Sequence, residues 1–283
     1  MNIDWRPACP LAALEARARL MAELRAFFAE RDVLEVQTSI LAAHTVTEVA
    51  IESMAVGALG YLQTSPEYQM KRLLAAGAPS IYQITPVFRA GEAGRLHNPE
   101  FTLLEWYRLG FDDRALMKEV TALVERVLGP GRTEILAYGD LVGDLEQPRD
   151  DLDLAISEAI DALGEGRFFI TRYPAEQAAL ARLHADDPSV AARFELVIDG
   201  VEVANGYWEL TDAEEQRRRF AADVEQRRRR GLVEPAPDER LLASLDAGLP
   251  DCAGVALGVD RLLMLQQGAS SLAEVMPFPI DRA

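Results

Sequence analysis

Polar side chains gather at the junction of two apolar segments of the sequence. Residues 81–89 and 101–107 are rich in apolar and β-branched residues, which predicts two strands of a hairpin. The loop and its borders carry four nitrogen-bearing side chains, those of Arg89, Arg95, His97 and Asn98. Glu105 and Tyr107 are two residues apart, so they face the same side of their strand. A carboxylate and a phenol on a buried face are costly unless a polar ligand binds there, although a hairpin with a solvated charged tip would also explain the pattern.

Three glutamates at seven-residue intervals lie in and beside a second predicted hairpin. Asp199-Gly200 between two apolar runs is a strong signal for a two-residue turn. The turn predicts three opposed pairs: Ile198 with Val201, Val197 with Glu202, and Glu195 with Ala204. Glu195 and Glu202 then lie diagonally on one face, about 7–8 Å apart between backbones and within side-chain reach of a shared ion. Oxygen ligands favour a hard cation such as Mg²⁺ held with phosphates, and Glu209 in the same series argues against a merely exposed polar face.

Two predicted helix starts also carry charged side chains. Ser65 is placed to cap a helix whose first position is Pro66, with Glu67 in the first turn, where a carboxylate suits the helix dipole. Capping electrostatics alone is therefore one explanation of Glu67. Residues 251–260 predict a glycine-containing strand that leads into a helix begun by Arg261. A helix N-terminus and a guanidinium together form a strong anion site, but a glycine-spaced strand before a helix is weak evidence by itself.

The rest of the pattern predicts the elements that must position these side chains. Apolar residues at three- and four-residue spacing predict a helix over residues 11–30, and alternation predicts a strand over 32–37. Further along the chain we expect a strand region at 45–63, a helix from 66 to 77, a helix at 115–128 and a charged helix at 212–230. The acidic cluster within 137–170 is interpreted as solvated surface. The arginine-rich helix is interpreted as a solvated face, with a docking patch as the alternative.

Length and composition restrict the kind of protein. A chain of 283 residues with 49% hydrophobic residues can bury the core of one large domain, or of one domain with an insertion. Two distant cysteines and three scattered histidines lack metal-ligand spacing. The net charge of −17 repels a phosphate backbone, which disfavours broad nucleic-acid binding. The sequence has no apolar run of about 20 residues and no signal-peptide pattern, so a cytoplasmic protein with reduced thiols is expected.

Three segments, in order along the chain, resemble the signature motifs of one enzyme family. FR at 88–89 with RLHNPEFT at 95–102 is similar to the second motif of class II aminoacyl-tRNA synthetases. GVALGVDR at 254–261 is similar to the third motif, and EVANGYWEL at 202–210 resembles the signature of the lysine branch. The resemblance extends from about residue 14 to residue 283. It implies an α+β fold, with a class II aminoacyl-tRNA synthetase-like antiparallel β-sheet flanked by helices.

Two features favour the relatives that modify elongation factor P. The first catalytic-domain helix is expected near residue 11, which leaves no room for an N-terminal anticodon-binding barrel, and the acidic charge argues against tRNA. The resemblance therefore implies a single catalytic domain over residues 1–283, without an anticodon-binding domain and with a shortened, variable insertion region at 137–185. It further implies an ATP-dependent, AMP-forming lysine–protein ligase that uses Mg²⁺, forms a homodimer, joins lysine to elongation factor P and has no membrane partner.

The resemblance also implies the roles of individual site residues. Arg89 would hold the α-phosphate and Arg261 the γ-phosphate of ATP, as the catalytic residues. The ATP-binding residues implied by the motifs are Arg89, Glu92, His97, Asn98, Glu202, Val203, Gly258 and Arg261. The residues implied for the amino-acid substrate are Ser65, Glu67, Glu105, Tyr107, Glu209 and Ala256. Among these, Glu209 and Tyr107 would bind the distal ammonium. Mg²⁺ would be held by Glu195 and Glu202.

Three places in the sequence depart from the family pattern or refine it. Ser39 stands where the first motif normally has a proline after its strand, which affects the expected dimer interface. Gly91 stands where the second motif usually has glutamate, and Glu92 follows, so adenine recognition is expected one residue later. Ala256 replaces the glycine of lysyl-tRNA synthetases. Its methyl would trim the pocket, an effect of about 1–3 kcal/mol that predicts a preference for (R)-β-lysine over α-lysine.

Two other functions stay open at the level of sequence. A lysine-activating enzyme of this kind would also be able to load another carrier, such as a small RNA or a carrier-protein thiol. A catalytically silent paralogue would act as a binding or regulatory module. The presence of Arg89, Arg261 and all three glutamates speaks against the silent module, because those side chains are needed only for phosphoryl chemistry and substrate binding.

Overall fold

The computed structural model describes residues 5–283 and divides the chain into two compact units, each built from separate stretches of sequence. The first unit comprises the chain up to Trp106 together with Asp212–Leu249 and Gly258–Ala283. The second unit comprises Tyr107–Thr211 and Pro250–Leu257. Both contain strands and helices, as the predicted α+β class requires. No helix within residues 5–283 is long and apolar enough to cross a membrane.

The strands of the first unit include both strands of the predicted hairpin. Its hydrogen-bonded neighbours, in order, are β1 (Leu34–Glu35), β4 (Ile81–Phe88) and β5 (Glu100–Leu109), the last of which belongs to this unit up to Trp106. β1 runs parallel to β4, and the strand predicted at 32–37 is thus only two residues long. A separate antiparallel pair consists of β2 (Leu41–Ala42) and β3 (Tyr61–Leu62).

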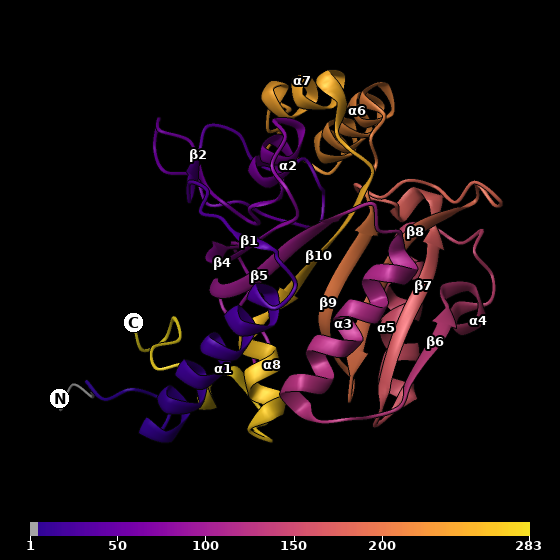
Figure 1. Ribbon diagram of the computed structural model, residues 1–283. Coiled ribbons are helices and arrows are strands. Elements are labelled where there is room, and N and C mark those ends of the chain that lie inside the picture. The colour runs from indigo at the N-terminus through magenta and orange to yellow at the C-terminus, as the bar shows by residue number, and fades with distance from the viewer. Residues whose placement is uncertain (1–4) are drawn as a thin grey trace. The chain divides into compact units, whose positions relative to one another are not determined.

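Some helices of the first unit pack on its sheet, and others pack on one another. They are α1 (Leu11–Ala29), α2 (Glu67–Ala75), α6 (Ala213–Arg229), α7 (Glu239–Gly248), α8 (Val259–Gln266) and the short 3₁₀ helix η2 (Leu272–Glu274). Figure 1 shows α1 beside α8, and α2 beside α6 and α7. On the buried face of α1, the Phe28 ring stacks on Tyr82 at 4.4 Å and meets Trp106 edge-on at 5.3 Å. The predicted amphipathic helix at 11–30 is confirmed.

Asp260 joins three elements of the first unit around the third motif. Its carboxylate is 2% exposed and accepts hydrogen bonds from the Arg17 guanidinium at 2.5 Å and from the Thr102 backbone N–H at 2.6 Å. Because a buried carboxylate without partners is costly, this double pairing fixes α1, β5 and α8 relative to one another. The neighbouring Arg261 therefore starts from a rigid backbone position.

The strand region predicted at 45–63 is wrong. Within this stretch, which the structure describes completely, strand pairing is confined to β3 and one isolated bridge. The Arg227 guanidinium of α6 instead donates to the carbonyl oxygens of Glu48 at 2.7 Å and Ile51 at 3.2 Å. Side-chain donors from a distant helix thus satisfy the carbonyls that a strand ladder would have paired.

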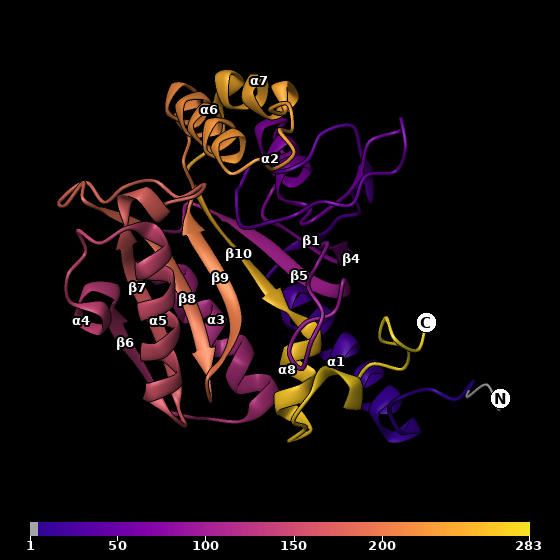
Figure 2. The ribbon, with the colours of Figure 1, turned by 180° about the vertical axis from the view of Figure 1, so that it is seen from behind.

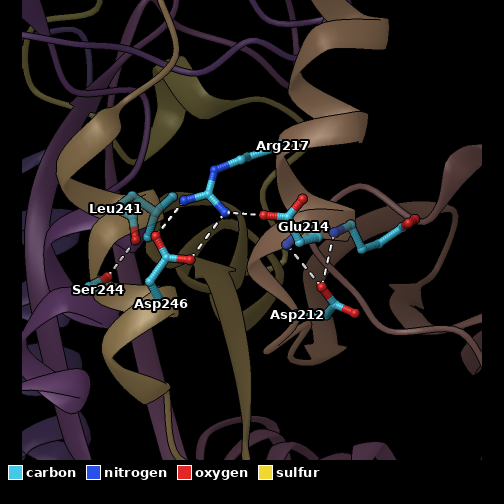
Figure 3. A network of polar contacts seen from close by, with 7 residues as sticks. Asp212, Glu214, Arg217, Leu241, Ser244 and Asp246 are labelled. Atoms are coloured by element: carbon cyan, nitrogen blue, oxygen red, sulfur yellow. Dashed lines mark hydrogen bonds and ion pairs between the residues drawn. The ribbon is translucent and has the colours of Figure 1, made fainter.

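The charged helix α6 is tied to α7 by ion pairs, as Figure 3 shows. Asp212 caps α6, because its carboxylate accepts the backbone N–H of Glu214 at 2.9 Å. Arg217 pairs with Glu214 at 2.9 Å and with Asp246 of α7, whose pKa it lowers. The interpretation as a solvated face holds for these residues. It is wrong for Arg227, whose side chain is buried at 5% exposure.

The second unit is a five-stranded part of the sheet between two helices. Its strands, in hydrogen-bonded order, are β10 (Cys252–Gly258), β9 (Val201–Trp208), β8 (Val190–Ile198), β7 (Arg167–Pro174) and β6 (Thr133–Ala137). Its helices are α3 (Asp113–Leu128), α4 (Tyr138–Val142), α5 (Arg149–Leu163) and the 3₁₀ helix η1 (Ala175–Gln177). Figures 1 and 2 show α3 and α5 on opposite faces of this sheet. The expected antiparallel pairing holds except between β6 and β7, which are parallel.

The acidic stretch of the second unit has one buried side and one solvated side. Leu152 and Ile156 of α5 pack against a core that includes Tyr138 and Val197. The acidic side chains of the stretch are exposed, namely Asp140, Asp144, Glu146, Asp150, Asp151 and Asp153. The interpretation of this cluster as solvated surface is confirmed.

The β8–β9 hairpin turns where the sequence predicted but then slips by one residue. Asp199 and Gly200 form the turn with φ values of 51° and 75°, which glycine and aspartate tolerate. A bulge between Leu196 and Val197 then shifts the register, so Glu195 lies opposite Asn205 and not opposite Ala204 as predicted. The prediction failed because an extra residue in one strand of a ladder leaves no local sequence signal.

Candidate active site

Two predicted substrate residues meet over Gly254 in the second unit. A methyl group built on Gly254 would lie 2.3 Å from Cε1 of Tyr107 and 2.5 Å from Oε1 of Glu209. Glycine at this position of β10 therefore leaves the space that the phenol and the carboxylate occupy. Both side chains are buried, at 2% exposure for Tyr107 and 1% for Glu209. The atoms nearest to this position are therefore those of protein side chains.

A second row of side chains crosses β8, β9 and β10. Asn205 of β9 lies opposite Glu195 of β8 and opposite Ala256 of β10. Directly opposed residues point to the same face of a sheet, and Gly254 is two residues from Ala256, so the two rows share one face. The amide of Asn205 donates to Oε1 of Glu195 at 3.0 Å. The register thus gathers residues predicted for metal and substrate on one surface.

The predicted metal-binding carboxylates differ in their surroundings. Glu195 also accepts a hydrogen bond from the Arg193 guanidinium at 2.5 Å, and that guanidinium lies 4.3 Å from the Tyr173 ring. Glu202 is exposed. Burial and the negative charges of Glu195 and Glu202 raise the pKa of the Tyr173 hydroxyl well above its usual value.

This donor set fits a magnesium ion that is held mainly by phosphates. Mg²⁺ prefers oxygen ligands and typically binds through one or two protein carboxylates plus substrate phosphates and water. Within residues 5–283, no three His, Cys, Asp or Glu side chains are arranged as a metal cluster. Glu195 and Glu202 therefore suit a shared, substrate-dependent site better than a permanent protein cage.

Arg89 lies at the end of β4 in the first unit, with part of its guanidinium accessible. Its Nε donates to the carbonyl oxygen of Thr64 at 3.4 Å, and its Cζ lies 5.2 Å from the Phe101 ring. Glu92 approaches Arg89 to 3.7 Å across the turn at Gly91, whose φ of 77° suits glycine. The guanidinium is thus oriented by a carbonyl and an aromatic face, while the loop around it is short and polar.

Arg261 and His97 form a direct pair in the same unit. The guanidinium of Arg261 donates to Nε2 of His97 at 2.9 Å and to the Leu96 carbonyl oxygen at 3.2 Å. Arginine has no acceptor, so His97 must accept through an unprotonated Nε2. Burial and the positive charge of Arg261 lower the pKa of His97, which keeps the imidazole neutral. The predicted phosphate ligand is therefore held by the loop that carries Arg89.

Asn98 fixes the end of that loop. Its amide donates to the Glu100 carbonyl oxygen at 2.6 Å, and its carbonyl oxygen accepts the backbone N–H of Ile280 at 2.9 Å. The side chain is 6% exposed. One end of the Asn98 amide is thus bonded to the start of β5, and the other joins the loop to the C-terminal segment. Its predicted role toward the nucleotide stays a prediction.

Two remaining nucleotide residues lie in β9 and at the end of β10. Val203 is buried and is the extra residue of the β9 bulge, between Glu202 opposite Val197 and Ala204 opposite Leu196. A bulge releases backbone groups from the regular ladder, which suits a backbone contact with a ligand. A methyl group built on Gly258 would meet nothing closer than 3.8 Å. Protein packing therefore does not require glycine at 258.

The predicted residues for the substrate amino group form one hydrogen-bonded chain in the first unit. Ser65 Oγ donates to Oε2 of Glu105 at 2.7 Å and accepts the backbone N–H of Glu67 at 3.0 Å. The predicted cap is wrong in position, because the N-cap residue of α2 is Pro66 and the helix begins at Glu67, but Ser65 does bind a backbone N–H of the first turn. Glu67 pairs with Lys71 at 2.7 Å, and Lys71 is 1% exposed. Capping electrostatics therefore explains only part of what surrounds Glu67.

Comparison with known proteins shows the family. Residues 3–282 match the family described as tRNA synthetases class II (D, K and N). The chain belongs to this family. It is 41% identical to the elongation factor P–(R)-β-lysine ligase of Vibrio cholerae, over 100% of this chain and 99% of that protein. Identity is 45% to the ligase of that name from Proteus mirabilis and 43% to that from Yersinia enterocolitica, in both cases over 99% of this chain and 98% of the relative.

These similarities confirm the resemblance stated from the motifs, the fold class and the assignment to the ligases. The class II synthetase family has an α+β fold, which agrees with the strands and helices of both units. The chain is an enzyme of the amino-acid ligase type. The roles of individual residues rest on the motifs and the geometry, not on the relatives.

Sequence reasoning missed several side chains that hold the class II motifs in place. Arg182 donates to the Glu209 carbonyl oxygen at 2.9 Å and to the Asp251 carboxylate at 2.7 Å, with its guanidinium 4.2 Å from the Trp208 ring. The indole N–H of Trp208 donates to the same carboxylate at 3.0 Å. Lys71 was also passed over, although its i, i+4 spacing from Glu67 was a local signal. Arg182 gave no such signal, because these side-chain contacts lie 26 or more residues away.

Proposed function

We propose that this enzyme activates lysine, with a preference for (R)-β-lysine, as an aminoacyl-adenylate and transfers it to a lysine side chain of elongation factor P. The observation that carries the proposal is the buried Glu209 carboxylate beside Tyr107 over Gly254. A carboxylate at 1% exposure is well placed to receive a cation that arrives with the substrate. The names of the relatives supply the acceptor protein and the isomer.

The amino acid would be recognised at both of its cationic ends. Glu209 and Tyr107 would bind the distal ammonium, and a substrate lacking that charge would strand the carboxylate. Ser65, Glu67 and Glu105 would meet the amino group near the carboxylate end. Since specificity from unpaired polar groups exceeds that from lost apolar contact, charge is expected to decide which amino acid is activated.

The nucleotide would be held by cations. Arg89 would contact the α-phosphate and Arg261 the γ-phosphate, in agreement with the accessible guanidinium of Arg89 and the loop-anchored guanidinium of Arg261. Glu92, His97, Asn98 and Gly258 would border the nucleotide, and the backbone beside Val203 would contact it. Mg²⁺, held by Glu195 and Glu202, would neutralise phosphate charge when bound. Positioning and charge stabilisation by these side chains would carry the chemistry, because phosphoryl transfer needs little acid–base assistance.

The two steps would proceed without a covalent enzyme intermediate. In the first, the amino-acid carboxylate attacks the α-phosphorus of ATP, and pyrophosphate leaves with the electrons of the broken P–O bond. In the second, an unprotonated lysine amine of the acceptor attacks the acyl carbon, forms an amide, and releases AMP and a proton. Arg89 would stabilise the charge that develops on the α-phosphate during the first step.

Ala256 supports the preference for the β-isomer. Its methyl lies on the face that carries Gly254 and Asn205, opposite the latter in the ladder. One carbon in a pocket changes discrimination by about 1–3 kcal/mol, which corresponds to roughly 10- to 200-fold. ATP–pyrophosphate exchange with (R)-β-lysine and with α-lysine measures this preference directly. Comparable exchange with both isomers would remove the support that Ala256 gives.

The decisive experiment separates the possible acceptors. The enzyme is incubated with ATP, Mg²⁺ and radiolabelled lysine isomers, together with either purified elongation factor P or bulk tRNA. We expect label in elongation factor P and none in tRNA. Label in RNA alone would favour the alternative carrier, and the absence of exchange with any amino acid would indicate a silent binding paralogue. We further propose that the enzyme is a cytoplasmic homodimer and that this chain acts as a single catalytic domain.

A further inference from the structure

One of the few lysines of this chain is buried beside a proposed substrate ligand. Only two of the 29 Lys and Arg residues are lysines, Lys71 and Lys118. Lys118 is exposed on α3, whereas Lys71 on α2 is 1% exposed. Burying an ammonium is costly unless it is paired, so a lysine at such a position requires an explanation beyond solubility.

We propose that Lys71 is a positioning residue that fixes the Glu67 carboxylate for the amino group of the substrate. This inference rests on the proposed function, in which Glu67 meets the substrate amino group. The Nζ of Lys71 donates to Oε1 of Glu67 at 2.7 Å. Because Lys71 cannot move without exposing or stranding its own charge, the carboxylate that it holds is oriented as well.

The same network reaches the second carboxylate of the site. Ser65 Oγ accepts the Glu67 backbone N–H and donates to Oε2 of Glu105. Glu105 is 2% exposed, and the side chain of Glu67 is 13% exposed. Lys71, Glu67, Ser65 and Glu105 therefore form one connected set, in which backbone and side-chain bonds alternate. A shift of Glu67 would disturb the bond between its backbone N–H and Ser65 at the start of α2. It would thereby also disturb the bond from Ser65 to Glu105.

An ordinary helix ion pair is the simpler explanation of the contact. Glu67 and Lys71 have the i, i+4 spacing that stabilises isolated helices by about 0.2–0.5 kcal/mol. Such pairs lie on solvated faces, where both side chains keep their hydration. Lys71 is almost fully buried, so its pairing serves to keep a charge inside the protein, which an exposed helix pair does not need to do.

A double-mutant cycle tests the proposal on the full-length enzyme. Lys71→Met, Glu67→Gln and the double variant are compared with wild type in ATP–pyrophosphate exchange, and Lys118→Met is the matched control on an exposed lysine. For Lys71→Met we expect KM for the amino acid to rise at least about tenfold, while KM for ATP stays within about twofold. Lys118→Met should behave as wild type.

Coupling distinguishes positioning from a structural role. If Lys71 acts through Glu67, the double variant has about the same KM for the amino acid as Glu67→Gln alone. The proposal would be overturned if the effects of the two single substitutions on KM for the amino acid multiplied in the double variant. It would also be overturned if Lys71→Met raised KM for the amino acid and KM for ATP in parallel, or left KM for the amino acid unchanged. The double variant buries a neutral pair and keeps the test valid if Lys71→Met unfolds. If the wild-type enzyme activates no lysine isomer, the proposed function itself fails. If the wild-type enzyme is active and Lys71→Met leaves KM for the amino acid unchanged, only this inference is refuted.

Discussion

At the scale of single residues, the protein surrounds buried charges with partners that fix their direction. The backbone of Glu209 is held by Arg182 and by a hydrogen bond to the Cys252 carbonyl oxygen at 3.0 Å. Glu195 is held by Arg193 and Asn205. A carboxylate fixed in this way has little freedom left to lose when a cation binds, which strengthens binding without additional contacts.

Glu209→Gln should abolish discrimination for the distal ammonium while leaving the fold intact. The change removes one charge and keeps the side-chain volume, so the pocket stays formed. We expect kcat/KM for lysine to fall about 100-fold or more, because the substrate ammonium would be buried without a counter-charge. ATP–pyrophosphate exchange and thermal unfolding measure the two effects. Glu158→Gln on the exposed side of α5 is the control, and unchanged lysine activation in Glu209→Gln would refute the assignment.

The titration of His97 should report its pairing with Arg261. Burial and the Arg261 charge depress the pKa of the imidazole, so the folded protein prefers the neutral form. The unfolded chain then binds more protons, and this contribution to stability is lost as pH falls below the ordinary histidine value of about 6.5. NMR titration should give a pKa below that value in wild type and a higher one in Arg261→Gln. A pKa that does not respond to Arg261→Gln would contradict the pairing; His97→Gln assigns the signal.

At the scale of elements, glycines and one arginine decide how strands and helices approach each other. On β10, Gly254 and Gly258 belong to the same motif but have different surroundings. A side chain at 254 would collide with Tyr107 and Glu209, whereas one at 258 would only touch Arg261 at 3.8 Å or more. On α6, adjacent arginines are equally distinct, since Arg227 is buried and Arg228 is exposed.

Gly254→Ala should damage the amino-acid pocket and the stability of the second unit together. Overpacking of this kind typically costs about 1–3 kcal/mol, and the displaced Tyr107 and Glu209 should raise KM for lysine. Gly258→Ala is the matched control for stability and should keep the unfolding free energy close to wild type. Chemical denaturation and exchange kinetics give the two readouts. Equal destabilisation by both substitutions would show that the contacts of Gly254 are not the cause.

Arg227→Met should release residues 45–51 from α6. The substitution leaves the carbonyls of Glu48 and Ile51 without their donor, and a lost buried partner costs about 1–3 kcal/mol. We expect faster limited proteolysis within residues 45–60 and a lower free energy of unfolding. Arg228→Met removes the neighbouring exposed arginine and should change stability by no more than about 0.5 kcal/mol. Identical protease sensitivity of the two variants would refute the role of Arg227.

At the scale of the whole molecule, chain connectivity and charge dominate. Each compact unit is assembled from stretches that are far apart in sequence, so neither can be read as a continuous segment. The net charge of −17 is spread over a surface that includes the exposed acidic side chains of α4 and α5. Such a field favours solubility and repels polyanions.

The acidic field should prevent stable binding of bulk tRNA. We expect no retention of labelled tRNA by micromolar enzyme in a filter assay, even at low salt, where electrostatic attraction would be strongest. Elongation factor P in the same assay format serves as the positive partner. Retention of tRNA that falls steeply with added salt would reveal a local basic surface that outweighs the net charge.

Local signals in the sequence determined much of this protein. The Asp199-Gly200 turn, the helix at 11–30 and the hairpin strands at 81–89 and 101–107 follow from turn chemistry and periodicity, which depend on neighbouring residues. The order of the three motifs determined the family, because it requires only residue types at fixed spacing. These features were confirmed by the structure or by the comparisons.

Only the tertiary structure decided which charges are buried and what holds them. Three features were not predicted: the bulge that places Glu195 opposite Asn205, the hydrogen bonds that Arg227 donates within residues 45–51, and the burial of Lys71 beside Glu67. Each depends on register or packing between segments distant in sequence, where residue type alone leaves several arrangements of similar local energy. The sequence therefore supplied the reactive groups, and the folded chain determined their partners, because burial and pairing are properties of the assembled structure.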